Sequence, residues 1–375
     1  MKKIFMLLIA VLLVVFAGGC GNSADDGNAD DNYSVDKINA EVSPAKEPEK
    51  VIDIKAVGDI MLGRNVQVKL NYDYPLAFEQ VKDILNDADI TFGNLECTLS
   101  DRGEKLIGKG AWLRAQPQAV DALKYAGIDI VSIANNHILD YNSPALKQTI
   151  SILDENDIKH VGAGDNITEA RKPVILEQNG IKIGFLAYSD LYQYGYKVDG
   201  QTGYRTLEAT DKQSGIAPLK EDIIISDIAT LRPEVDLLFV SLHWGVEESF
   251  NIPLKQRELG HNIIDAGADM ILGHHPHQLQ GTEIYNGKPI IYSMGNFIFD
   301  QNDDENKDSI IVSAKYVNGK ITHLSQMPVR IVDKRQAVPV YGDDATKLLS
   351  YLLQMSKDVG SDCKIENDVL VYSLE

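Results

Sequence analysis

The stretch GADMILGHHPHQLQG, residues 267–281, joins a short apolar run to a cluster of histidines. The run is Met-Ile-Leu at 270–272, and an apolar run bounded by glycines is typical of a buried strand. His274, His275 and His277 follow it at once, although the whole chain contains only eight histidines. We therefore expect a strand that ends in ligand-capable side chains, and the rest of the chain repeats this pattern.

Short apolar runs alternate with longer amphipathic segments through most of the chain. The runs predict buried strands near residues 51–57, 89–92, 128–134, 235–242, 268–272 and 289–293. The amphipathic segments predict helices near residues 75–87, 116–126, 143–156, 215–231 and 253–266. Strands and helices in alternation are typical of an α/β domain with largely parallel strands.

Two Asn-Gly pairs mark antiparallel additions to this core. One pair lies in the middle of residues 173–188 and the other lies within residues 309–333. Asn-Gly between apolar segments is the strongest short signal for a hairpin turn. We expect two hairpins that extend the parallel strands, and the tail, residues 343–375, predicts one helix and a short strand.

The N-terminus has the layout of a bacterial secretory signal. Two lysines precede the apolar run 4–16, and small residues lead from there into Cys20. The run is shorter than the roughly 20 residues of a membrane-spanning helix, so we expect cleavage. A cysteine in this place resembles a lipobox and predicts lipid attachment at Cys20, although Ala17 stands where leucine is usual. The alternatives are an uncleaved anchor or ordinary secretion, and each places the protein outside the cytoplasm.

Composition divides the 375 residues into a leader, a tether and a folded part. Residues 1–19 form the expected signal peptide, and residues 20–50 are rich in acidic residues, Gly, Asn, Ser and Pro, which predicts a disordered tether. The domain is expected at 51–335, with a C-terminal extension at 336–375 packed on it. The net charge of −19 discourages binding to nucleic acid.

The chain has two further cysteines, Cys97 and Cys363, which lie far apart in the sequence. A disulfide between them and two buried free thiols are both compatible with the sequence.

Polar side chains follow each of the six predicted strands. In chain order they are Gly58-Asp59, Gly93-Asn94-Leu95-Glu96, Asn135-Asn136-His137 with Asp140, His243-Trp244-Gly245, Gly273-His274-His275-Pro276-His277 and Gly295-Asn296. Ligands of open α/β sheets bind beyond the carboxyl ends of the strands, where the loops converge. The sequence therefore predicts one site built from these six loops.

The chemistry of these side chains indicates divalent metal ions. Carboxylate, amide and imidazole without thiolate suit Mn²⁺, Fe²⁺ or Zn²⁺ rather than a structural zinc. The donors exceed the needs of one tetrahedral ion, and two ions about 3.5–4 Å apart would use them and would suit in-line attack on phosphorus. His275 and His277 are two residues apart, so each could bind a different ion, whereas we expect His274 to point the other way.

Six ordered motifs carry a resemblance to a known family. They are GDIML at 58–62, NLE at 94–96, ANNHILD at 134–140, HWG at 243–245, GHHPHQLQG at 273–281 and YSMGNFIFD at 292–300. Together they resemble the bacterial capsule synthesis protein family, CapA, which is associated with poly-γ-glutamate capsules and is similar to the calcineurin-like metallophosphoesterases. The resemblance spans residues 51–333 and implies an α-β-β-α sandwich with mixed sheets, to which the hairpins are additions.

The resemblance also implies a role for each site residue. The implied metal ligands are Asp59, Glu96 as the bridging carboxylate, Asn136, His243, His275 and His277. His137 resembles the general acid, held by Asp140. Taken singly, each has a structural alternative, such as a turn cap, a helix N-cap, a solvated acid or a core histidine.

Two residues are expected to contact an anionic substrate. Arg64 lies just past the first motif and could neutralise a substrate oxygen, and Asn296 could line the pocket or close a turn. Lys105, Lys109 and Arg114 could add positive charge to the pocket.

The chain departs from the phosphoesterase pattern in two motifs. Met61 stands where those enzymes have the histidine of Asp-x-His, and Asn94 and Glu96 stand where they have an Asp-containing motif. One of the two ions would lose an imidazole and bind more weakly.

Two functions are compatible with the sequence. The first is a metal-dependent hydrolase outside the membrane that acts on a phosphoester or on an amide-linked polymer such as poly-γ-glutamate. The second is a non-catalytic subunit that binds the polymer or a membrane-bound capsule synthase and assists export.

Overall fold

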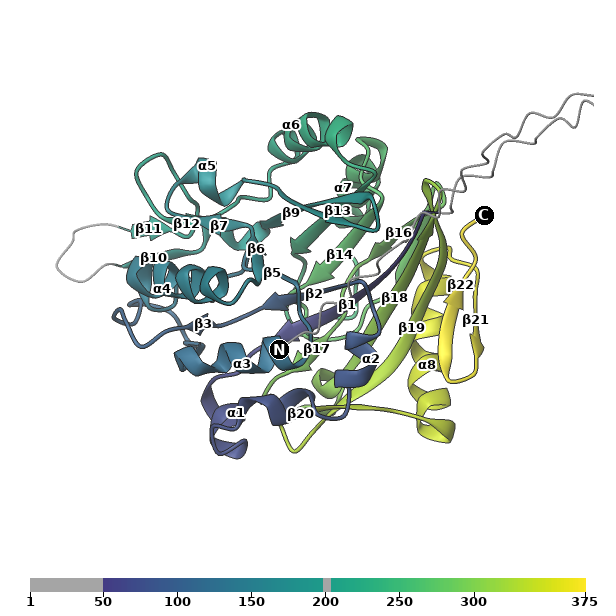
Figure 1. The fold of residues 1–375 in the computed structure, drawn as a ribbon, viewed down its shortest axis with the longest axis horizontal. Coiled ribbons are helices and arrows are strands. Elements are labelled where there is room, and N and C mark those ends of the chain that lie inside the picture. Colours follow the sequence, from purple (N-terminus) through teal and green to yellow (C-terminus); the bar gives the residue numbers. More distant parts are fainter. Residues whose placement is uncertain (1–49, 198–203) are drawn as a thin grey trace, which may run out of the picture. The chain divides into compact units, whose positions relative to one another are not determined.

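Two β-sheets form the centre of the protein in the computed structural model, which describes residues 50–197 and 204–375 (Figure 1). The larger sheet has the order β21 (Cys363–Glu366), β22 (Val369–Tyr372), β19 (Lys320–Val332), β18 (Asp308–Val317), β1 (Val51–Ile60), β2 (Ile90–Leu95), β5 (Ile130–Ser132) and β6 (Lys159–Val161). Strands β1, β2, β5 and β6 are parallel, and β18 to β22 are antiparallel. Two short strands join it, with β17 (Asn296–Ile298) beside β1 and β20 (Gln336–Pro339) beside β19.

The second sheet is smaller and is also mixed. Its order is β15 (Thr282–Tyr285), β16 (Lys288–Ile291), β14 (Met270–His274), β13 (Leu237–His243), β9 (Ile181–Ser189) and β8 (Val174–Gln178). The four inner strands are parallel and the two outer strands are antiparallel to their neighbours. The inner strands are buried on both faces, which explains why they appear in the sequence as continuous apolar runs.

The two sheets pack face to face across an apolar core. Phe92 of β2 stacks on Phe185 of β9 with ring centroids 5.9 Å apart, and Phe239 of β13 packs edge-on against Phe185 at 5.6 Å. Helix α8 (Gly342–Asp358) adds Leu349 and Leu352 to the same core. Aromatic pairs of this geometry stabilise the contact beyond the area that they bury.

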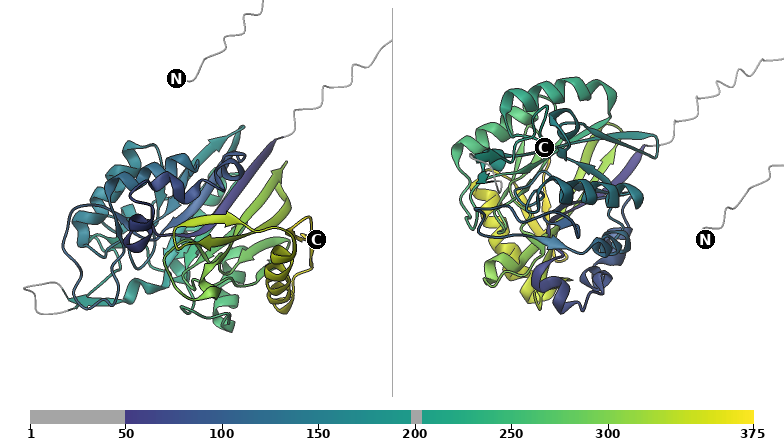
Figure 2. Two further views of the ribbon diagram at one scale, coloured as in Figure 1. Left: turned by 90° about the horizontal axis from the view of Figure 1, so that it is seen from below. Right: turned by 90° about the vertical axis from the view of Figure 1, so that its left-hand side faces the viewer.

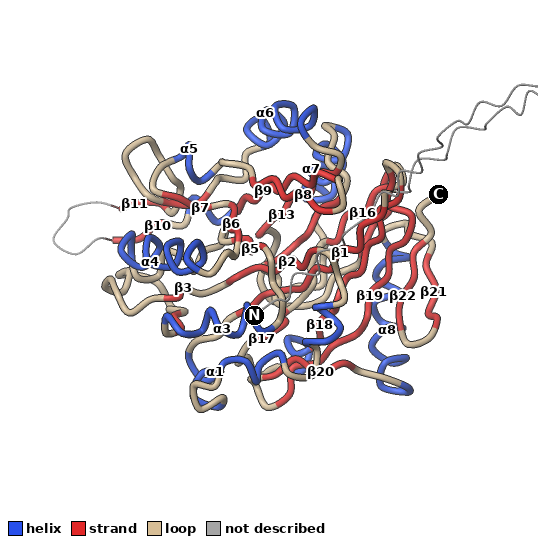
Figure 3. Tube along the Cα trace, viewed as in Figure 1, coloured by secondary structure: helices blue, strands red, loops and turns tan. Residues whose placement is uncertain are grey.

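Helices cover the outer faces of the two sheets (Figure 3). The larger sheet is covered by α1 (Arg64–Lys69), α2 (Lys82–Asn86), α3 (Val120–Tyr125) and α4 (Asn142–Glu155). The second sheet is covered by α6 (Glu221–Leu231), α7 (Leu254–Asp265) and the short α5 (Ile167–Ala170). Figure 2 shows the green helices and the purple-to-blue helices on opposite sides of the sheets. This architecture confirms the expected α-β-β-α sandwich with mixed sheets.

The predicted strands and hairpins are all present. Both Asn-Gly pairs form two-residue turns, with φ of 55° and 70° at Asn179 and Gly180 and of 47° and 98° at Asn318 and Gly319. Positive φ at both central positions is the requirement that Asn-Gly meets at low cost. The antiparallel additions therefore lie where the sequence predicted them.

Two predicted helices differ from the structure. Residues 75–87 form a 3₁₀ turn, Tyr74–Phe78, and then the short α2. The helix predicted from residue 215 begins only at Glu221, because Gly215–Ile216 form strand β12 and Pro218 disfavours helix in the residue before it. The tail contains a two-stranded hairpin, β21 and β22, rather than one strand.

The remaining elements are short. They are β3 (Thr98–Leu99), β4 (Arg114–Ala115), β7 (Ala163–Gly164), β10 (Gly195–Lys197), β11 (Tyr204–Thr206) and the 3₁₀ turns Pro117–Ala119, Asp190–Gln193, Arg232–Glu234 and Asp304–Lys307.

Cys97 and Cys363 are both buried free thiols, so the disulfide alternative does not hold. The expected signal peptide, the lipid site Cys20 and most of the acidic tether lie outside the described residues. Within the described parts of the chain, no helix combines the length and the apolar character that crossing a bilayer requires.

Candidate metal centre

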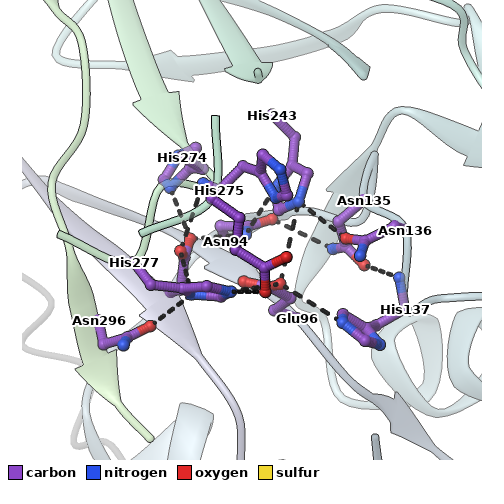
Figure 4. Close-up of polar contacts among 12 residues, drawn as sticks. Asn94, Glu96, Asn135, Asn136, His137, His243, His274, His275, His277 and Asn296 are labelled. Atoms are coloured by element: carbon purple, nitrogen blue, oxygen red, sulfur yellow. Dashed lines mark hydrogen bonds and ion pairs between the residues drawn. The ribbon is translucent and has the colours of Figure 1, made fainter. Parts of the chain in front are cut away.

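The polar loops of both sheets meet at one place (Figure 4). From the larger sheet, Asp59 pairs in register with Asn94 on one side and with Asn296 on the other. From the second sheet, His243 at the end of β13 pairs with His274 at the end of β14. The carboxyl ends of parallel strands in two facing sheets therefore deliver these side chains to a shared pocket.

Glu96 occupies the middle of this pocket. Its side chain is fully buried, and neither carboxylate oxygen has a hydrogen-bond partner. Its Oε1 atom lies 3.9 Å from the Nε2 atoms of His137, His243 and His277. Burial, and then the negative charge of Asp59, raise the pKa of Glu96 well above its ordinary value. A buried carboxylate without a partner is costly, and a cation at this point would satisfy it.

Asp59 is the second buried carboxylate of the pocket. Its Oδ1 accepts a hydrogen bond from Asn94 Nδ2 at 2.8 Å and lies 3.1 Å from His274 Nδ1. Burial by itself would raise the pKa of Asp59, but the hydrogen bond and charge of His274, the charge of His277 and the hydrogen bond from Asn94 together lower it. Asp59 is thus held as a carboxylate, which is the form that binds metal ions.

The expectation for His274 was wrong. We predicted that it points away from the site, because neighbouring residues of a strand face opposite sides. Met270, Leu272 and His274 share one face of β14, and the first two lie in the core between the sheets, so regular strand alternation turns His274 towards Asp59. His275 has a φ of 97°, and its backbone N–H donates to the other Asp59 oxygen at 3.4 Å.

Two imidazoles and one amide lie on the other side of Glu96. His243 Nε2 lies 2.9 Å from Asn136 Oδ1, so the two atoms that each residue would offer to an ion face each other. The ring of His275 lies 4.8 Å from that of His243, and its buried Nδ1 has no partner. Burial and neighbouring histidines lower the pKa of His243 well below its usual value and that of His275 to about 3. Neutral imidazoles are the form that coordinates metal ions.

His277 is oriented by Asn296. Its Nδ1 lies 2.9 Å from Asn296 Oδ1, so this nitrogen carries the proton and Nε2 stays available. The Asn296 amide donates in turn to Gln301 Oε1 at 2.6 Å and to the Asn306 carbonyl at 3.0 Å. The amide of Asn296, for which the sequence suggested substrate contact, is thus used to position His277.

Asp59, Glu96 and His277 form the one group of three acidic, histidine or cysteine donors within the described residues whose ligand atoms all lie within 4.8 Å of one another. The unpartnered oxygens of Glu96 and the free Nε2 of His277 fit a divalent cation.

A separate pair, His137 and Asp140, lies beside the donors. His137 Nδ1 is 2.7 Å from Asp140 Oδ2, and the same carboxylate accepts from the Leu113 N–H at 2.6 Å and from Lys109 Nζ. Burial lowers the pKa of His137, and the charge of Asp140 opposes that effect. Lys109 also donates to the Asn136 carbonyl, so its ammonium group is bound within this network and does not face the pocket as a free charge.

The other basic residues, Arg64, Lys105 and Arg114, each contact an acidic or aromatic partner. Arg64 pairs through Nε with Asp300 Oδ2 at 3.1 Å and through Nη2 with Oδ1. Its guanidinium carbon lies 5.9 Å from the centre of the Phe299 ring, which itself packs 5.0 Å from His277. Lys105 lies over Trp112 and Arg114 lies over Tyr141.

A family model described as "Bacterial capsule synthesis protein PGA_cap" matches residues 53–301. The chain belongs to this family. The chain is 33% identical over 299 residues to the curated protein "Capsule biosynthesis protein CapA" of Bacillus anthracis. The match covers 77% of this chain and 70% of the relative. The chain is 30% identical over 331 residues to "PGA biosynthesis protein CapA" of Bacillus subtilis, covering 87% and 83%.

Among solved structures, the calcineurin-like phosphoesterase YfkN from Bacillus subtilis is 14% identical, with a TM-score of 0.42 over 83% of this chain and 98% of that chain. A putative 5'-nucleotidase from Staphylococcus aureus is 12% identical, with a TM-score of 0.45 over 81% and 58%.

Several residues of the pocket have roles that the sequence did not show. Asn135 donates to Asn94 Oδ1 at 3.2 Å and accepts from the His137 N–H at 3.1 Å, so it ties two strand ends together as well as capping the loop. Asn94 and Asn135 lie inside the recognised motifs, and that position was the available signal. Glu247, whose Oε1 lies 3.7 Å from His277 Nε2, lies in a loop without any regular pattern.

Proposed function

We propose that the protein is a metal-dependent hydrolase that acts outside the cytoplasm in the production or export of a capsule polymer such as poly-γ-glutamate. The observation that carries this proposal is the buried Glu96, unpartnered at both oxygens and 3.9 Å from three imidazole nitrogens. No structural role explains such a carboxylate, whereas a cation at its oxygens does.

Family and relatives supply the biological setting. The two Bacillus relatives carry the names of capsule and PGA biosynthesis proteins, and one from Mycobacterium tuberculosis, 27% identical, is named a probable polyglutamine synthesis accessory protein. Attachment to the membrane through a lipid at Cys20 would hold the protein beside a membrane-bound capsule synthase. We propose that synthase and its anionic polymer as partners.

The donors divide into two ion positions that share Glu96. Asp59, Glu96 and His277 would hold one ion, and Glu96, Asn136, His243 and His275 would hold the other. Mn²⁺, Fe²⁺ and Zn²⁺ suit these donors. Bound ions would stabilise developing negative charge and lower the pKa of a water molecule.

The chain's own residues handle the proton and the geometry. Asp140 accepts from His137 Nδ1, so Nε2, which faces Glu96, is the atom from which the doubly protonated ring would give a proton to the leaving group. Lys109 and the Leu113 N–H hold Asp140 in place. Arg64, about one-third exposed beside Phe299, is proposed to meet a substrate anion at the rim.

Met61 favours a second candidate, a non-catalytic subunit that binds polymer or synthase. Met61 is fully buried in the core, and its sulfur accepts a hydrogen bond from the Gly63 N–H at 3.2 Å. It therefore replaces a possible imidazole ligand with a core side chain, and weak loading of one ion would reduce turnover.

Metal content and turnover together separate the two candidates. The purified protein and its His275→Ala and His137→Ala variants would be compared for bound metal and for hydrolysis of a generic phosphodiester and of poly-γ-glutamate. The hydrolase requires stoichiometric metal that His275→Ala reduces, and turnover that His137→Ala removes while metal stays bound. Bound metal without turnover of either substrate would support the subunit, and absence of metal would reject the metal centre.

A further inference from the structure

We infer that Glu247 is an additional ligand of the ion held by Asp59, Glu96 and His277, and that it makes this position selective for a hard cation such as Mn²⁺. The inference rests on the metal centre proposed above. It concerns the ion position that Met61 leaves without a second imidazole.

Two carboxylates flank the one free nitrogen of His277. Glu247 Oε1 lies 3.7 Å from His277 Nε2, and Glu96 Oε1 lies 3.9 Å from the same atom. The other nitrogen of this ring is already committed to Asn296. The carboxylate of Glu247 therefore reaches the atom through which His277 would bind an ion.

The loop that carries Glu247 is anchored on both sides. The Gly245 N–H donates to Asp190 Oδ2 at 2.9 Å, and the Glu248 N–H donates to the Pro276 carbonyl at 2.9 Å. Gln280 Nε2 then holds the carbonyl of Ser249 at 2.8 Å. The anchors at Pro276 and Gln280 belong to the histidine-bearing loop, so the backbone that carries Glu247 is held next to that loop.

Glu247 approaches from the solvent side, whereas the other three donors are buried. Its side chain is 62% exposed, against 0–3% for those of Asp59, Glu96 and His277. Among the side chains that the structure describes, those of residues 50–195 and 206–375, its only ion pair is with His277, and no lysine or arginine pairs with it. An acid at this place completes the donor set from the open side of the pocket.

The resulting donor set has a chemical consequence. Three carboxylates and one imidazole are harder than the two-imidazole set that an Asp-x-His motif would provide. Carboxylate ligands suit Mn²⁺ and Mg²⁺, while imidazole suits Zn²⁺. We therefore expect this position to prefer Mn²⁺ over Zn²⁺.

Binding of Mn²⁺ to the metal-free protein tests the inference without any substrate. Free Mn²⁺ would be followed by its electron paramagnetic resonance signal, and Zn²⁺ by competition, for the natural protein and for Glu247→Gln. We expect two Mn²⁺ per natural protein and at least about a tenfold weaker second Mn²⁺ in Glu247→Gln, as losses of even indirect metal contacts reach this size. Glu248→Gln makes the same charge change one residue away and is expected to bind as the natural protein does.

A second variant distinguishes the loss of a metal ligand from a general disturbance of the pocket by Glu247→Gln. Glu247→His is expected to restore the second ion and to shift the preference towards Zn²⁺. Equal Mn²⁺ binding by the natural protein and Glu247→Gln would overturn the inference and leave the proposed function standing. A natural protein that binds no Mn²⁺, Fe²⁺ or Zn²⁺ would reject both.

Discussion

Replacing Glu96 by glutamine is expected to stabilise the metal-free protein and to destroy its response to metal. The carboxylate of Glu96 is fully buried with neither oxygen hydrogen-bonded. Glutamine has the same shape, carries no charge, and its NH₂ can donate to the imidazole nitrogens that surround position 96. Glu96 would thus lower the stability of the metal-free protein and raise the stability of the metal-bound protein.

The magnitudes follow from general values. A buried polar group without a partner costs about 1–3 kcal/mol, and Glu96→Gln should recover much of this. With an unfolding entropy of about 2.1 cal/mol/K per residue, residues 48–375 convert 1 kcal/mol into roughly 1.5 °C of Tm. We expect a rise of about 2–4 °C in the metal-free variant. For the natural protein, an ion at 100 times its Kd adds about 2.7 kcal/mol, or roughly 4 °C, which the variant should not gain.

Thermal unfolding with and without chelator measures both effects. Four curves are needed, for natural protein and Glu96→Gln, each metal-free and with Mn²⁺. Glu248→Gln serves as the control and should behave as the natural protein. A metal-free Glu96→Gln that melts below the natural protein, or that gains as much from Mn²⁺, would refute the reasoning.

Three further predictions concern the same pocket. His137→Ala should lower kcat by about 10²–10⁴-fold with unchanged metal content, measured by steady-state kinetics and metal analysis. Asn296→Ala should weaken one ion by about 10–100-fold because His277 loses its orienting partner, measured by Mn²⁺ titration. The pKa of Glu96 is raised in the folded state, so the contribution of Glu96 to the stability of the metal-free protein is fully present below its unfolded pKa and is lost as pH rises through the folded pKa; urea midpoints should fall over this range in the natural protein more than in Glu96→Gln.

The strands were predictable because buried strands have apolar sequences that can be recognised locally. The runs that became β13 and β14 are buried on both faces, so every residue in them is apolar or small up to the histidine that ends each strand. The helix boundary near Pro218 was not predictable by periodicity, because the apolar pattern continues across the short strand β12. Which strands share a sheet was also hidden, since the pairing of β9 with β13 joins residues about fifty positions apart.

The site was predictable where its residues lie directly behind strands. Asp59, Asn136 and His243 come together as expected for side chains at converging strand ends. His274 was misplaced because the sequence does not show which face of β14 meets the other sheet; Met270 and Leu272 lie on that face, and His274 continues it. Glu247 was missed because three hydrogen bonds to distant residues, and no local pattern, fix its loop.

The division of the pocket between two sheets has a consequence for the durability of the metal-free protein. Asp59 and Glu96 lie at strand ends of one sheet, and His243 and His277 at strand ends of the other, so each proposed cation would be held by donors from both layers. The metal-free protein would lack this connection, and we expect its two layers to separate more readily under thermal motion. At the location proposed above, outside the cytoplasm, proteases would degrade metal-free copies first, so the amount of protein would follow the supply of metal.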